Sequence, residues 1–123
     1  MVGYKTNIEK ETLNNKFFRK VLFTGKNSQL VVMSLKKGDD IPLEIHKTHD
    51  QFIRIEKGSA FVKIGSSKFN LKADDVIIVP AGNWHYVKNT TKGDLKLYTI
   101  YSPAEHKPGT IHKTRKDAIN AEH

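Results

Sequence analysis

Apolar residues recur along the chain in short runs that alternate with polar residues or end at Gly, Pro, Asn or Asp. The runs lie at 18–25, 30–38, 51–58, 60–65, 75–82 and 95–103. Alternation with period two places apolar side chains on one face of a strand, and evenly spaced short strands are typical of a sandwich or barrel. The pattern predicts an all-β domain of antiparallel strands, with Val76 and Ile78 in the core.

The two ends of the chain lack this alternation. Residues 6–16 are polar and predict a loosely held N-terminal arm. The C-terminal segment TRKDAINAEH, at 114–123, is the helix candidate within a short tail. Because no repeat, linker or low-complexity tract interrupts the chain, residues 1–123 are expected to form a single domain.

Composition excludes several kinds of site. The sequence has no cysteine, so it has no disulfide, no thiolate metal site and no cysteine nucleophile. The apolar run at 76–81 is too short to cross a bilayer, and the first ten residues lack the apolar segment of a signal peptide. We therefore expect a soluble, cytoplasmic protein with no membrane partner.

The net charge is +8, from 21 Lys and Arg against 13 Asp and Glu, which would suit an anionic partner. However, the lysines are scattered singly through predicted turns, and the sequence has neither a basic helix nor the aromatic and glycine pattern of an RNA-binding sheet. We therefore expect no nucleic-acid partner and interpret most of the charge as solvated surface.

The candidate chemistry begins in the segment EIHKTHDQ, at 44–51. Residues two apart on a strand share a face, so Glu44 and His46 are expected to point together. If that face is internal, Gln51 begins the next strand with a parity that also sends Ile53 inward. This arrangement predicts polar groups at one mouth of a barrel and aliphatic side chains deeper inside.

A further histidine follows a turn in PAGNWHYVKN, at 80–89. His85 is expected on a strand entered through a Pro-x-Gly turn, with Val87 on the same face. The sequence therefore offers a third ligand-type residue, besides Glu44 and His46.

These spacings resemble the two motifs of the cupin family. The first motif, Gly-x5-His-x-His-x4-Glu-x6-Gly, aligns with Gly38, Glu44, His46, Gln51 and Gly58. The second, Gly-x5-Pro-x-Gly-x2-His-x3-Asn, aligns with Asp74, Pro80, Gly82, His85 and Asn89. The resemblance covers residues 30–101 and implies a small antiparallel double-stranded β-helix, the jelly-roll barrel of cupins.

More narrowly, DQFIRIEKG, VPAGNWH, LKLYTIYSPAEH and GTIHKT are similar to microbial cupins described as mannose-6-phosphate isomerase-like. The chain departs from the family motifs at three positions. Glu44 replaces the first histidine, Gln51 replaces the glutamate, and Asp74 replaces the glycine that opens the second motif.

The resemblance implies one divalent metal ion, held by Glu44, His46, Gln51 and His85. Two imidazoles and a carboxylate suit Mn, Fe, Zn or Ni, and two histidines with one carboxylate are also the ligands of iron oxygenases. Because the amide of Gln51 is a neutral, weak donor, we expect looser binding than with three histidines and a glutamate.

Other roles stay open for several of these residues. Glu44 is also able to pair with a lysine, and Gln51 to hydrogen-bond the barrel mouth. His49 is expected at the rim and would replace Gln51 if that residue is not a ligand, while Tyr98 is a candidate for orienting a bound molecule. Two histidines of the tail are expected to pack on the barrel exterior: His106 and His112.

Two function classes follow. The first is a metal-dependent enzyme, isomerase-like or dioxygenase-like, acting on a small polar substrate such as a sugar or sugar phosphate. The second is a non-catalytic, metal-stabilised module that binds or senses a small molecule, since fold alone does not decide function. We also expect a homodimer, because exposed aromatic residues on a strand favour association. Its surface would contain Phe17, Phe18, Phe52 and Arg54.

Overall fold

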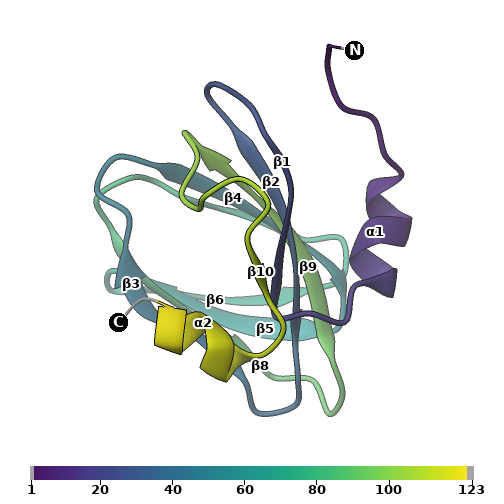
Figure 1. Ribbon diagram of the computed structural model, residues 1–123. Helices are drawn as coiled ribbons and strands as arrows, with labels where there is room; N and C mark the ends of the chain where they lie inside the picture. The colour runs from purple at the N-terminus through teal and green to yellow at the C-terminus, as the bar shows by residue number, and fades with distance from the viewer. Residues whose placement is uncertain (1, 122–123) are drawn as a thin grey trace.

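The computed structural model describes residues 2–121, which form ten strands in two facing antiparallel sheets (Figure 1). The first sheet has the order β10 (Ile111–His112), β1 (Arg19–Thr24), β2 (Gln29–Leu35), β9 (Leu95–Ser102), β4 (Asp50–Lys57) and β7 (Val76–Val79). The second has the order β3 (Asp40–Ile45), β8 (Trp84–Asn89), β5 (Ser59–Ile64) and β6 (Ser67–Lys72). This architecture confirms the predicted double-stranded β-helix.

Alternation along the strands decides which side chains enter the space between the sheets. In β4, Gln51 and Ile53 are at most 1% exposed, whereas Phe52 and Arg54 lie on the outer face and are half-buried. The predicted parity of this strand is therefore confirmed. The aliphatic core between the sheets includes Val31, Met33, Leu35, Ile53, Ile55, Val62, Val87 and Leu97.

Strand β7 has the opposite phase to the one predicted. Val76 and Ile78 are 46% and 57% exposed, and their neighbours Ile77 and Val79 are buried. An uninterrupted apolar run carries no alternation, so its phase is set by the pairing partner, which here aligns Ile77 with Ile53 of β4. The expectation that Val76 and Ile78 belong to the core was wrong.

The polar N-terminal segment contains helix α1 (Ile8–Asn14), so the prediction of a loose arm was also wrong. Asn7 caps the helix by accepting a backbone N–H of the first turn. The helix covers part of the outer face of the six-stranded sheet, where Thr12 is fully buried (Figure 1). Lys96 of β9 holds the end of α1 by donating to the Asn15 carbonyl at 2.6 Å.

At the other end, helix α2 (Arg115–Ala121) confirms the C-terminal helix candidate within the described residues. Strand β6 was missed because it is a largely exposed edge strand with few apolar residues. No helix within residues 2–121 combines the length and apolar character needed to cross a bilayer.

Two turns have a positive φ at positions where the family motifs have glycine. Gly58 has φ 98°, and a Cβ there would collide with Thr91 Oγ1. Asp74, at the glycine position of the second motif, keeps a positive φ of 76°. Aspartate tolerates this left-handed conformation better than most residues. Its carboxylate accepts a hydrogen bond from Arg54 at 2.8 Å, so the departure from the motif preserves the turn.

Candidate metal centre

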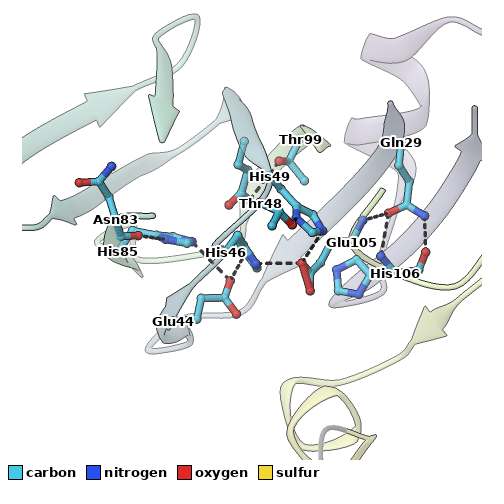
Figure 2. A network of polar contacts seen from close by, with 11 residues as sticks. Gln29, Glu44, His46, Thr48, His49, Asn83, His85, Thr99, Glu105 and His106 are labelled. Atoms are coloured by element: carbon cyan, nitrogen blue, oxygen red, sulfur yellow. Dashed lines mark hydrogen bonds and ion pairs between the residues drawn. The ribbon is translucent and has the colours of Figure 1, made fainter. Parts of the chain in front are cut away.

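Three potential ligands converge where β3 and β8 pair at the barrel mouth (Figure 2). Glu44 Oε1 lies 3.2 Å from His46 Nε2 and 3.5 Å from His85 Nε2. Glu44 and His85 face each other in the strand register, and His46 follows Glu44 by two residues. The structure thus brings together the three charged or imidazole residues that the motif spacing selected.

The orientation of His85 leaves one ring nitrogen available. His85 Nδ1 lies 3.3 Å from the Asn83 carbonyl, which only accepts hydrogen bonds, so the Nδ1 atom carries the proton. The Nε2 atom then presents its lone pair toward Glu44. This nitrogen is buried and has no hydrogen-bond partner, which is costly unless another group binds it.

His46 is held from its other side by Glu105. The Nδ1–H of His46 donates to Glu105 Oε2 at 2.9 Å, which directs Nε2 toward Glu44. A carboxylate behind an imidazole is the usual partner of a metal-bound histidine, because it fixes the ring and raises its basicity. Sequence reasoning missed Glu105, whose only signal is an acid beside a histidine just after the last long strand.

Gln51 is the fourth predicted ligand and points inward at the start of β4. It is 1% exposed, and its Nε2 donates to Thr99 Oγ1 at 3.1 Å. This bond leaves Gln51 Oε1 buried without a hydrogen-bond partner. An orphaned carbonyl oxygen is a suitable neutral metal ligand.

His49 and Tyr98 occupy different places. The Nε2 of His49 lies 3.2 Å from Glu105 Oε2, so His49 is a rim residue tied to the back of His46. Tyr98 lies on the outer face of the six-stranded sheet, with its ring centroid 6.1 Å from that of Phe52. The structure does not bring Tyr98 to the other candidate site residues, because its parity is opposite to that of Tyr101, whose ring stacks edge-on against His46 inside the barrel.

The segment after β9 folds back over the mouth and brings His106 inside. Gln29 of β2 accepts hydrogen bonds from the backbone N–H groups of Glu105 and His106, and donates to the His106 carbonyl at 2.7 Å (Figure 2). The His106 ring packs edge-on against Tyr101 at 5.2 Å. The expected exterior position of His106 was therefore wrong. His112, in β10, contacts Arg19 of β1.

The charges of the site favour a cation. Burial opposes ionisation of Glu44, but the hydrogen bond from His46 and the nearby His85 ring outweigh it and lower its pKa to about 2. Burial also opposes protonation of His46, but Glu105 and Glu44 raise its pKa to about 9. Two carboxylates thus surround His46, and a divalent cation would take the place of its Nε2 proton.

The residues present therefore fit a metal ion on two independent counts. The donor set of one carboxylate, two imidazoles and one amide oxygen suits Mn, Fe, Zn or Ni. In addition, His85 Nε2 and Gln51 Oε1 are buried polar atoms without hydrogen-bond partners.

Comparison with known proteins extends these observations. The family described as "Cupin domain" matches residues 31–101. The uncharacterized protein YrkC of Bacillus subtilis is 49% identical over 125 residues, covering 97% of this chain and 67% of YrkC. A crystal structure of BH2720 from Bacillus halodurans matches with a TM-score of 0.94 and 42% identity, covering 95% of this chain and 93% of that one. Quercetin 2,3-dioxygenase of Bacillus subtilis is 30% identical over 100 residues, covering 69% of this chain and 30% of the dioxygenase.

Proposed function

The chain belongs to the cupin family, and on this basis we propose that it binds one divalent metal ion through Glu44, His46, Gln51 and His85. One observation carries the proposal. His85 Nε2, which lies beside Glu44 and His46, and Gln51 Oε1, at the start of β4, are both buried without hydrogen-bond partners. Such atoms are rare in folded proteins unless they bind something else.

The site then acts on a small polar substrate. When bound, the metal ion supplies a Lewis acid or an oxygen-binding centre. Glu44 contributes the anionic ligand, Glu105 keeps the His46 ring in its ligating orientation, and Tyr101 with the aliphatic core below limits access of water from the barrel interior. The similarity to quercetin 2,3-dioxygenase supports the dioxygenase-like class, and the narrower motif resemblance supports the isomerase-like class.

A non-catalytic binding or sensing role is the second candidate. It is favoured by the contacts of the carboxylates near the mouth. Among the described residues, Glu44 and Glu105 both contact histidines, so neither is free to act as a general base. The isomerase-like subgroup, the cytoplasmic location and the absence of a nucleic-acid partner stay predictions of the sequence.

Metal analysis tests the proposal directly. Protein purified without chelators or nickel resin should contain one metal ion per chain, measured by mass spectrometry of metals. His46→Ala and His85→Ala should each lose the ion, whereas the matched control His112→Ala should keep it. Full occupancy in either ligand variant would exclude this site. Bound iron would favour oxygen chemistry, and bound zinc or manganese would favour the isomerase-like or binding roles.

We also propose a homodimer formed through the outer face of the six-stranded sheet. Val76 and Ile78 are exposed there, and Phe52 and Tyr98 lie on the same face. Phe18, which the sequence placed on this surface, is 2% exposed and belongs to the core. Light scattering should give twice the 14.0 kDa chain mass. Ile78→Glu should yield a monomer, whereas Phe69→Glu, on the other sheet, should not.

A further inference from the structure

Arg19 is a buried cation that forms no ion pair with the part of the chain that the structure describes. It lies at the start of β1 on the same inward parity as Val21, and it is 3% exposed. Among residues 2–121, no aspartate or glutamate forms an ion pair with it. Its Nη1 lies 3.2 Å from His112 Nδ1, and its Nε has no hydrogen-bond partner. A buried guanidinium is expensive without an anion, so an external anion would complete this environment.

The guanidinium shares a cavity with a proposed metal ligand. Arg19 and Glu44 both line a cavity of about 50 Å³, which α2 borders with Ala118 and Ile119. Helix α2 lies close to β3 and β10, so the cavity is at the edge where the two sheets approach each other (Figure 1). A cavity of this size accommodates a few atoms, about the size of a carboxylate group.

His106 has a second buried ring atom without a hydrogen-bond partner, and it lies within range of the charge of Arg19. Its Nε2 is buried without a hydrogen-bond partner, while Gln29 and Tyr101 fix the position of the residue. Burial, together with the charge of Arg19, lowers the pKa of His106 to about 4, so the ring is neutral near pH 7. One full positive charge and one neutral donor suit a monoanion better than a phosphate dianion.

His106 also faces a route from solvent. Together with His112, the contact residue of Arg19, it lines an open cleft of about 420 Å³. Arg19 thus lines the cavity at Glu44, and His106 lines the cleft together with the residue that contacts Arg19.

We propose that Arg19 and His106 bind the carboxylate of a small organic acid, whose remaining polar groups face Glu44 and the other metal ligands. This inference rests on the proposed metal centre. The substrate class is thus a small carboxylic acid and not a sugar phosphate.

Calorimetry on the metal-loaded, full-length protein tests this assignment, with glycolate as the carboxylate probe, glycolamide as its neutral analogue and inorganic phosphate as the competing anion. Wild type should bind glycolate in preference to both. Arg19→Met should weaken glycolate binding about 10- to 100-fold, the range for loss of a charge-assisted hydrogen bond. Arg19→Lys should recover part of the loss, and the matched control Arg54→Met, on the outer face, should bind as wild type does.

Stability without any probe gives a second readout. Because Arg19→Met removes an unpaired buried charge, its melting temperature should equal or exceed that of wild type. A decrease of about 5 °C or more would overturn the premise that this charge lacks a partner. If Arg19→Met does not fold, Arg19→Gln, which keeps donors without the charge, decides the binding comparison.

Metal content, measured on the same samples, separates this inference from the proposed function. Equal glycolate binding by wild type and Arg19→Met, no glycolate binding by metal-loaded wild type, or Arg19-dependent binding of phosphate in preference to glycolate would each overturn the carboxylate site. Wild type that lacks metal but binds glycolate through Arg19 would overturn the metal centre and support the anion site.

Discussion

The two ends of strand β8 carry equally buried polar residues with opposite roles. His85 and Asn89 lie on the same inward face and are 1% and 3% exposed. Asn89 Oδ1 accepts the Thr91 N–H at 2.8 Å. Its Nδ2 donates to the carbonyls of Leu35, Lys36 and Gly93. By contrast, His85 has one hydrogen bond, to the Asn83 carbonyl, and its Nε2, 3.5 Å from Glu44 Oε1, has no hydrogen-bond partner.

Both residues belong to the same family motif, so motif membership does not separate structure from function. Burial does not separate them either. The difference lies in hydrogen-bond saturation, because a side chain whose donors and acceptors are all used inside the protein stabilises the fold, whereas an unused buried atom is available to bind a ligand. In β8, Asn89 therefore stabilises the connecting loops, and His85 is the residue available to bind the metal ion.

The largest expected effect is on metal binding by His85→Ala. A structural metal site with four ligands contributes about 10–16 kcal/mol, so loss of one ligand should weaken affinity by about 3–4 kcal/mol, or several hundred-fold. Competition titration with a chromogenic chelator measures this. The apo protein should unfold at an unchanged or higher urea concentration, because an unsatisfied nitrogen is removed. Marked destabilisation of the apo protein would make His85 a structural residue like Asn89.

Asn89→Ala should show the converse behaviour. Three carbonyls and one backbone N–H lose their partner, so the free energy of unfolding should fall by about 2–3 kcal/mol. Urea unfolding of the apo protein measures the loss, and Asn70→Ala, at an exposed position of β6, is the control. The variant should still bind one metal ion per chain. Loss of metal without loss of stability would contradict the comparison.

Glu105→Gln extends the comparison to the second imidazole. The amide still accepts a hydrogen bond from His46 Nδ1, but without negative charge, so metal affinity should fall about 10- to 100-fold. Chelator competition measures the effect, and Glu9→Gln, an exposed position in α1, is the control. An unchanged metal affinity would mean that Glu105 only holds His49 and the tail in position.

The smallest effect concerns Glu44, the register partner of His85. Glu44→His replaces a hard anionic ligand with a neutral imidazole, which should lower the affinity for Mn relative to Ni by about tenfold. Gln51→Glu should do the reverse by adding an anionic ligand. Competition titrations with both metals on the three proteins measure the ratios. An unchanged ratio in Glu44→His would exclude Glu44 as a ligand and favour a set that includes His49.

Local periodicity made much of the fold and part of the site predictable. The parity of β4, the shared direction of Glu44 and His46, and the position of His85 follow from an alternation that neighbouring residues impose on a strand. The phase of β7 did not follow, because its run is apolar throughout and only pairing with β4 orients it. Helix α1 was missed because its polar residues conceal the small buried face that docks on the sheet.

The sequence by itself determined most of the strands, the turns and the residue types able to hold a metal. Tertiary structure alone decided which polar atoms are satisfied and which are free to bind. The tail that follows β9 folds back and brings Glu105 to His46, His106 to Tyr101, and β10 beside Arg19. Hydrogen-bond saturation depends on such distant contacts, whereas side-chain direction along a strand depends on adjacent residues only.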